Sequence, residues 1–185
     1  INLILLSVKN EENLFETFLN QKYEDFISKE KCDRYDYVSH EFCDLNVGIA
    51  GCGRVGAKVE KKLKYLGFKT CGYDPFKDDN YFNENKIERI SKFDDFISNI
   101  DILVISISYK KDNINFFSHE KLKKLKKGSI IINTARGGII NELDLNKALD
   151  ENLIFGAGLD VFEKEPPIKD NLLLKNKKVI MSPHT

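Results

Sequence analysis

The chain has 185 residues, which is enough for one well-formed hydrophobic core and some additional chain. Its 29 basic residues balance its 29 acidic residues, so composition gives no general attraction to nucleic acid or to an anionic membrane. No apolar run approaches the ~20 residues that span a bilayer. The opening INLILLSVKN lacks the basic start and small-residue cleavage site of a signal peptide. We therefore expect a globular protein without nucleic-acid or membrane partners.

Residues 1–45 fit the pattern of the later chain less well: LILLSVKNEENLFETFL could form a helix, and NQKYEDFISKEKCDRYDYVSHEF is polar and aromatic without a clear period. We expect an N-terminal helix and an approach segment that packs on the rest of the chain. Because the first residue is Ile and not Met, we also expect the 185 residues to belong to a longer chain.

Residues 46–185 alternate between strand-like and helix-like segments, which predicts an α/β fold. The expected strands are NVGIAG, FKTCGY, DILVISIS, SIIIN, IFGAGLD and KVIMS, and the expected helices are RVGAKVEKKLKYLG, SKFDDFISN, SHEKLKKLKKG and NELDLNKALDEN. Such alternation favours a doubly wound parallel sheet that is covered on both faces.

Local signals set the expected limits of the helices. In the first, Val55, Val59, Leu63 and Leu66 share one face, and Gly67 is a natural stop.

The later helices carry signals of the same kind. Ser91 and Asp94 have the spacing of a capping box, Gly128 closes the third helix, and Asn141 caps the fourth. The lysine-rich run KLKKLKKG in the third helix is expected to bury its two leucines and expose its lysines.

Residues 51–56 read GCGRVG, a G-x-G-x-x-G motif between a predicted strand and a predicted helix. Gly51 allows the tight turn, Gly53 lets the backbone approach a pyrophosphate, and Gly56 lets the helix pack close to the strand. Asp74 ends the next strand, where its carboxylate can bind the ribose hydroxyls of NAD and repel the 2′-phosphate of NADP. The motif predicts a Rossmann-type fold and NAD as cofactor. Lys77 leaves NADP open, and a glycine turn without a ligand is the alternative.

Four cysteines, Cys32, Cys43, Cys52 and Cys71, show no metal-ligand spacing, so we expect no metal and reduced thiols in the cytoplasm. Cys52 falls within the glycine motif, where helix dipoles could lower its pKa and give it a redox role. We expect instead that it is a small buried filler.

Several charged side chains follow later strands. Arg136 follows SIIIN, the segment GAGLDVFEKEPP supplies Asp160, Glu163 and Glu165, and SPHT supplies His184. Ligands gather at the carboxyl ends of strands in an open parallel sheet, and an arginine there can hold a carboxylate with two hydrogen bonds. Scattered loop charges with no common site are the alternative.

Four segments together resemble the D-isomer-specific 2-hydroxyacid dehydrogenases: GIAGCGRVGAKVEKKLKYLGFKTCGYDP, KKGSIIINTARGGIINELDLNKAL, GAGLDVFEKEPP and SPHT. They occur in the family's order and spacing over nearly the whole chain. The resemblance implies the NAD-binding domain of an oxidoreductase that interconverts a 2-hydroxy acid and a 2-keto acid. It also implies dimerisation through this domain.

The resemblance assigns roles residue by residue. Arg136 would bind the substrate carboxylate and carbonyl, His184 would be the general acid/base, and Glu165 would stabilise its charged form. The residues expected to border the cofactor are Arg54, Val55, Thr134, Ala135, Arg136 and, near the nicotinamide, Asp160.

The chain departs from the family at VISISYKKDN, where Ser106 and Ser108 stand in place of a usual His and Pro. This puts the geometry of one cofactor loop in doubt. The resemblance further implies that the family's substrate domain is absent from this chain, so that His184 is the last catalytic residue before the chain crosses back to that domain.

Two questions stay open from the residues alone. The segments KTCGYDP, ARGGIINE and DVFEKEPP are most similar to the phosphoglycerate dehydrogenase branch. Glyoxylate/hydroxypyruvate and D-lactate enzymes, however, share much of these sequence motifs. A non-catalytic NAD-sensing corepressor of the same fold is the alternative to an enzyme.

Overall fold

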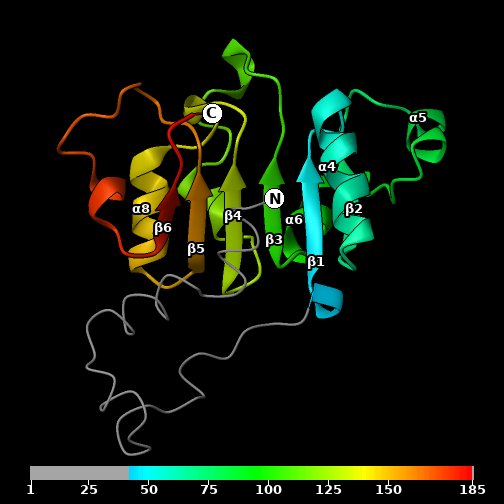
Figure 1. The fold of residues 1–185 in the computed structure, drawn as a ribbon, viewed down its shortest axis with the longest axis horizontal. Coiled ribbons are helices and arrows are strands. Elements are labelled where there is room, and N and C mark those ends of the chain that lie inside the picture. Colours follow the sequence, from blue (N-terminus) through cyan, green and yellow to red (C-terminus); the bar gives the residue numbers. More distant parts are fainter. Residues whose placement is uncertain (1–41, 185) are drawn as a thin grey trace, which may run out of the picture.

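Six parallel strands form the centre of the molecule in the computed structural model, which describes residues 42–184 (Figure 1). They occur in the sheet order β2-β1-β3-β4-β5-β6. Their bounds are β1 (Asn46–Ala50), β2 (Lys69–Tyr73), β3 (Ile102–Ile105), β4 (Ser129–Asn133), β5 (Ile154–Leu159) and β6 (Val179–Met181). Each predicted strand is present, and the predicted doubly wound, Rossmann-type α/β fold is confirmed.

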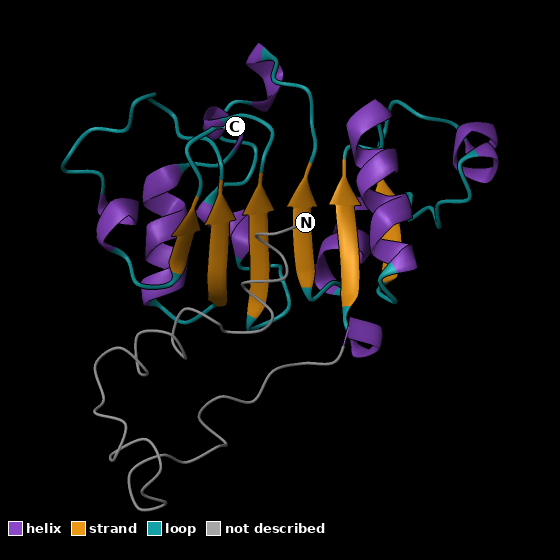
Figure 2. Cartoon of the chain, viewed as in Figure 1, coloured by secondary structure: helices purple, strands orange, loops and turns teal. Residues whose placement is uncertain are grey.

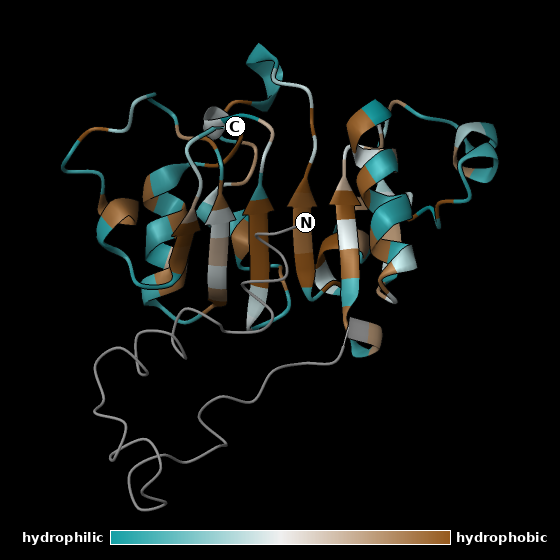
Figure 3. Ribbon diagram, in the orientation of Figure 1, coloured by the Kyte–Doolittle hydropathy of each residue, from teal (hydrophilic) through white to brown (hydrophobic). Residues whose placement is uncertain are grey.

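The central strands are apolar because both of their faces are covered. Every residue of β3 and β4 is buried, and Figure 3 shows β3 and most of β4 as strongly hydrophobic. The side chains alternate between two core clusters: Ile102 and Val104 belong to one, and Leu103 and Ile105 to the other.

Helices cover both faces of the sheet (Figure 2). Leu63 of α4 and Phe82 of α5 belong to one core cluster, whereas Phe96 of α6, Leu122 of α7 and Leu145 of α8 belong to the other. The helices are α4 (Arg54–Tyr65), α5 (Asp79–Glu84), α6 (Phe93–Ser98), α7 (His119–Leu122) and α8 (Glu142–Asp150), with the 3-10 turns η2 (Phe42–Asp44), η3 (Lys111–Asn113), η4 (Gly137–Ile139) and η5 (Leu172–Lys175).

The N-terminal helix expected within residues 1–45 lies outside the described residues, which include only the last four positions of that segment. There, η2 leads into Leu45, which is buried against the sheet. Among residues 42–184, no helix has both the length and the apolar character that a bilayer crossing requires.

The buried face of α4 differs from the predicted one. Leu63 is buried as expected, but Val55 is 61% exposed and Leu66 is 41% exposed. Glu60 is buried instead, because its carboxylate accepts a hydrogen bond from Thr70 Oγ1 at 2.7 Å and pairs with Lys64 at 2.7 Å. A hydrophobic pattern could not predict a buried carboxylate whose partner comes from the next strand.

The signals at the ends of the helices gave mixed results. Asn141 caps α8 by accepting a hydrogen bond from Asp144 N, as predicted. Gly67 follows α4 with a φ of +92°, which also agrees. The capping box at Ser91 was wrong: Lys92 precedes α6 without a side-chain cap, and the Asp94 carboxylate pairs with Lys124 at 2.7 Å.

The third predicted helix is much shorter than expected. It ends as α7 at Leu122. Lys124 N then donates to Lys121 O and Leu125 N to Leu122 O, both three residues back, and Gly128 N donates to Leu153 O. In a longer helix, lysines three or four residues apart, such as Lys123 and Lys127, would face one another, and their repulsion disfavours it. The leucines are nevertheless buried, as predicted. Sequence reasoning missed α5, although Asp78 caps it by accepting from Tyr81 N.

Candidate active site

The glycine turn between β1 and α4 is closed on its inner side and open on its outer side. Gly51 has a φ of +90°, and a Cβ there would approach Ser106 O to 2.7 Å. A Cβ on Gly56 would overlap the carbonyl oxygen of Gly51, whereas a Cβ on Gly53 would meet no atom within 4 Å. The open space lies at the N-terminus of a 12-residue helix, where free N–H groups favour an anion. The turn therefore fits a pyrophosphate.

Asp74 lies beside this turn at the end of β2. Its Oδ2 accepts a hydrogen bond from Cys52 N at 3.0 Å, and its Oδ1 accepts from Phe76 N at 3.0 Å. An ionised carboxylate has further lone pairs, so hydroxyl groups can still donate to it. The ammonium of Lys77 lies 4.4 Å from the centre of the Tyr81 ring, which places that cation against α5.

Cys52 is fully buried within the turn, and its Sγ lies 3.6 Å from the carbonyl oxygen of Ile49. Burial raises the pKa of this thiol to about 12, and the negative charge of Asp74 adds to the effect. A reactive thiolate is therefore disfavoured. The prediction of a small buried filler is confirmed, and the alternative of a lowered pKa is wrong.

The turn that carries Arg136 follows β4 and is held by a buried asparagine. Asn133 Oδ1 accepts from Ala135 N at 3.1 Å, and Asn133 Nδ2 donates to Arg136 O at 3.0 Å. Thr134 and Arg136 are both exposed. Arg136 Nη1 donates a hydrogen bond to Ala135 O at 2.6 Å. Sequence reasoning missed Asn133, although an asparagine at a strand end is a common turn former.

His184 and Glu165 come together although 19 residues separate them: His184 Nδ1 lies 2.6 Å from Glu165 Oε2. The other Glu165 oxygen accepts from Phe162 N at 3.2 Å. The hydrogen bond with His184 has the largest effect on the pKa of Glu165, which it lowers. The hydrogen bond from Phe162 N and the charge of Arg136 lower that pKa further. The carboxylate therefore stays ionised to lower pH than an ordinary glutamate and can stabilise a protonated imidazole.

Asp160 belongs to the same edge of the sheet. Its backbone N donates to Asn133 O at 3.0 Å, and its carboxylate accepts from Ser182 Oγ at 2.5 Å. Ser182 is a second residue that sequence reasoning missed, although it stands in the SPHT segment. The cavity beside these groups has a volume of ≈ 430 Å³ and is lined by Asp160, Phe162, Glu165, Pro166, Pro167, Leu174, Met181, Ser182, Pro183 and His184.

The loop after β3 contains Ser106 and Ser108, and both take part in backbone hydrogen bonds. Ser106 N donates to Ala50 O at 2.8 Å, which keeps the loop against the glycine turn. The carbonyl oxygen of Ser108 accepts from Asn113 Nδ2 at 2.7 Å. Local hydrogen bonds of this kind stabilise the loop without a proline.

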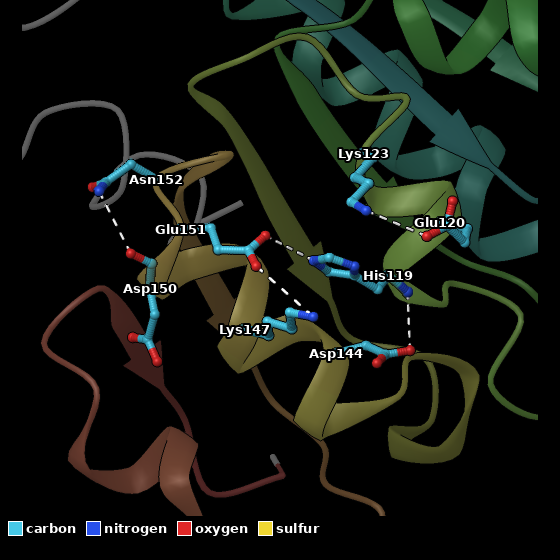
Figure 4. Close-up of polar contacts among 8 residues, drawn as sticks. All are labelled: His119, Glu120, Lys123, Asp144, Lys147, Asp150, Glu151 and Asn152. Carbon is cyan, nitrogen blue, oxygen red and sulfur yellow. Dashed lines mark hydrogen bonds and ion pairs between the residues drawn. The ribbon is translucent and has the colours of Figure 1, made fainter.

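The remaining described histidine has a structural setting, shown in Figure 4. His119 is 9% exposed, and its Nε2 lies 2.9 Å from Oε2 of Glu151, the residue that caps the C-terminal end of α8. Its backbone N donates to Asp144 Oδ2 at 2.9 Å. These contacts hold α7 against α8. The preceding Phe117 donates to Ile139 O at 3.0 Å, which supports the loop that follows Arg136.

The predicted site residues thus lie at one edge of the sheet, the upper edge in Figure 1. The glycine turn and Asp74 follow β1 and β2, and Arg136 follows β4. Asp160, Glu165 and His184 follow β5 and β6. Within residues 42–184, no three His, Cys, Asp or Glu side chains gather in a way that could hold a metal ion.

Comparison with known proteins identifies a family. Residues 16–185 match the model of the D-isomer specific 2-hydroxyacid dehydrogenase, NAD binding domain. A D-3-phosphoglycerate dehydrogenase of Archaeoglobus fulgidus is 33% identical over 158 residues, which cover 85% of this chain and 30% of that protein. A hydroxypyruvate reductase of Blautia hydrogenotrophica is 36% identical over 150 residues, 81% of this chain and 46% of that protein.

A solved structure agrees with this assignment. A probable 2-hydroxyacid dehydrogenase from Rhizobium etli, in complex with NADP, HEPES and L(+)-tartaric acid, superposes with a TM-score of 0.83 and 25% identity over 98% of this chain and 55% of that one. The chain thus spans less than half of the length of these two curated relatives, 30% and 46% respectively.

Proposed function

Because the chain belongs to the D-isomer specific 2-hydroxyacid dehydrogenases through their NAD binding domain, we propose that the complete protein interconverts a D-2-hydroxy acid and a 2-keto acid. The observation that carries this proposal is the 2.6 Å contact between His184 and Glu165. It occurs at the same edge of the sheet as Arg136 and the glycine turn. A histidine held by a carboxylate is suited to transfer a proton to or from a carbonyl oxygen.

The residues at the glycine turn fit a dinucleotide. Bound NADH would supply the hydride, and the protein would supply binding and orientation. The backbone N–H groups near Gly53 would hold the pyrophosphate, and Asp74 would accept hydrogen bonds from the ribose hydroxyls. The wider set of cofactor-binding residues that we propose is Gly51, Gly53, Arg54, Val55, Gly56, Asp74, Thr134, Ala135, Arg136 and Asp160.

Three side chains would act on the substrate. Arg136 would bind its carboxylate and polarise its carbonyl, because a guanidinium offers two parallel N–H donors to a carboxylate. The protonated imidazole of His184 would donate its proton to the carbonyl oxygen during reduction. Glu165 would stabilise the imidazolium and orient the ring through the Nδ1 contact.

The substrate class and the domain arrangement extend the proposal. A 3-phosphoglycerate dehydrogenase-like reaction is supported by the D-3-phosphoglycerate dehydrogenases among the relatives. Residues 46–185 would form the nucleotide-binding domain, residues 1–45 would lead into it, and a substrate domain would come from chain beyond the 185 residues. That arrangement accords with the fraction of each relative that this chain covers.

Two properties of the whole protein complete the proposal. We propose a homodimer formed through the nucleotide-binding domain, as the family resemblance implies. We also propose a cytoplasmic location, which is supported by the three described cysteines, Cys43, Cys52 and Cys71, all being free thiols.

The test uses the complete protein with NADH and a panel of 2-keto acids. His184→Gln should lower kcat for the best substrate by ~10²–10⁴, the usual contribution of a positioned acid or base. Arg136→Ala should raise the KM for the keto acid, because the substrate carboxylate loses its anchor. Wild-type turnover by His184→Gln would contradict the mechanism.

A further inference from the structure

The loop that carries Arg136 and the loop that carries Glu165 touch each other. Gly137 follows Arg136 directly, and a Cβ on Gly137 would overlap the carbonyl group of Phe162. Phe162 lies three residues before Glu165 and donates its backbone N–H to that carboxylate at 3.2 Å. The separation of Arg136 from Glu165 therefore depends on how these two loops are held together.

Two glutamates bridge the loops by crossed hydrogen bonds. Glu163 Oε1 accepts from Glu142 N at 3.1 Å, and Glu142 Oε1 accepts from Glu163 N at 2.5 Å. Each side chain thus bonds the backbone of the other residue. Glu142 Oε2 also accepts from Asn171 Nδ2 at 2.6 Å, which ties in the start of η5.

The chemistry of this pair favours a fixed geometry. Carboxylates make stronger and shorter hydrogen bonds to N–H groups than neutral acceptors do. Glu142 is the first residue of α8, so the carboxylate of Glu163 accepts one of the N–H groups that a helix N-terminus leaves without an intrahelical partner. The helix dipole also favours negative charge at this end. Two acidic residues can therefore lie close together here, because each accepts a backbone donor.

We propose that Glu142 and Glu163 are positioning residues, which set the spacing between the carboxylate anchor Arg136 and the acid/base pair Glu165–His184. This inference rests on the function proposed above. Neither glutamate contacts the reacting atoms in it. They act through the two loops, so that one substrate can meet Arg136 at its carboxylate and His184 at its carbonyl oxygen.

Three substitutions at Glu163 in the complete protein distinguish the effect of side-chain length from the effect of side-chain charge. Glu163→Gln keeps an accepting oxygen at the same reach, Glu163→Asp keeps the charge but shortens the side chain, and Glu163→Ala removes both. If the spacing of the two loops matters, Glu163→Asp and Glu163→Ala should lower kcat/KM for the keto acid by roughly 10-fold or more. A misplacement of a reacting group by about 1 Å can lower the rate by up to 10²-fold. Glu163→Gln should stay close to wild type. Lys164→Ala, an exposed neighbour in the same loop, is the matched control.

Two binding measurements exclude a general loss of structure. The Kd for NADH, measured by calorimetry, should change much less than the activity, because the glycine turn after β1 and Asp74 after β2 lie away from the two bridged loops. The Kd for oxalate, a non-reacting carboxylate probe added to the NADH complex, should rise in Glu163→Asp and Glu163→Ala. Melting curves identify a variant that fails to fold, in which case the contrast between Glu163→Gln and Glu163→Asp decides.

The outcomes distinguish the inference from the function on which it rests. Wild-type protein that reduces no 2-keto acid overturns the proposed function and this role with it. Wild-type protein that is active, with Glu163→Asp and Glu163→Ala equally active, overturns the positioning role alone. An unchanged Kd for oxalate in Glu163→Asp and Glu163→Ala also overturns it, because Arg136 would then have kept its place without the bridge.

Discussion

Two ionisable residues at the carboxyl edge of the sheet show how surroundings decide reactivity. The thiol of Cys52 is buried, which raises its pKa to about 12 and keeps it protonated. The carboxyl of Glu165 is exposed and accepts hydrogen bonds from His184 and from Phe162 N, which lower its pKa. Acid would therefore protonate this carboxylate, and weaken the Glu165–His184 pair, at a lower pH than for a glutamate without these hydrogen bonds. The cysteine fills space, and the glutamate is available for proton chemistry.

At the residue scale, Asp74 predicts the cofactor preference. Its carboxylate is fixed beside the glycine turn by the Cys52 and Phe76 amides. We expect the protein to bind NAD(H) more tightly than NADP(H), because a 2′-phosphate would be repelled there. Asp74→Ala should reduce the preference, and the exposed Asp95→Ala should leave it unchanged. Calorimetry with both cofactors measures this, and equal or reversed affinities in the wild type would exclude the role of Asp74.

At the element scale, the turn between β1 and α4 depends on each glycine for a different reason. Gly56 is needed for folding, because a Cβ there overlaps the Gly51 carbonyl. Gly53 has open space around it and an extended backbone with a φ of −71°. Only a bound ligand would make a side chain at Gly53 unacceptable. At this helix start, Gly56 is therefore required by packing, and the role that we propose for Gly53 is to leave room for the ligand.

This difference gives a prediction about two alanine substitutions. Gly53→Ala should lower stability by no more than ~1 kcal/mol, the usual effect of alanine at a helix N-cap, yet weaken NADH binding by at least ~10-fold. Gly56→Ala should lower the melting temperature much more strongly. Thermal denaturation and calorimetric titration measure the two effects. Normal NADH affinity in Gly53→Ala would show that the pyrophosphate does not occupy this space.

At the scale of the whole molecule, the candidate catalytic side chains are open to water. The side chains of His184 and Glu165 are 47% and 37% exposed, and Arg136 is also exposed. Acid–base and electrostatic catalysis are more effective where water is excluded and groups are held in place. We therefore propose that another part of the complete protein covers this edge of the sheet. The strand-end cavity beside His184 is the surface that it would close.

A prediction follows for the 185-residue chain by itself. It should bind NADH but reduce 2-keto acids far more slowly than the complete protein, because the site stays open. It should also sediment as a dimer at micromolar concentration, if the nucleotide-binding domain forms the interface. Absorbance of NADH and sedimentation velocity check the two expectations. Turnover equal to that of the complete protein would contradict the first, and a monomer would contradict the second.

Much of this protein is predictable from local sequence. The six strands, the glycine turn and the Asn141 cap depend on near neighbours along the chain, so periodicity and turn chemistry locate them. The same logic places Asp74, Arg136 and His184 after strands, and hence at one edge of a parallel sheet. Sequence patterns were less reliable at the ends of α6 and α7. There, ion pairs such as Lys124–Asp94 and repulsion along the lysine run compete with local signals.

The tertiary structure decided which of these residues meet. Glu165 and His184 are 19 residues apart, and Glu142 and Glu163 are 21 apart, yet each pair makes direct hydrogen bonds. These contacts depend on how β4, β5 and β6 lie side by side and on how their loops fold back, which no local pattern encodes. The buried Glu60 on α4 has the same origin, since its partner Thr70 lies on β2. The sequence by itself determined the elements and the edge at which the chemistry occurs. Packing between distant segments determined the distances there, because only the assembled sheet brings those side chains together.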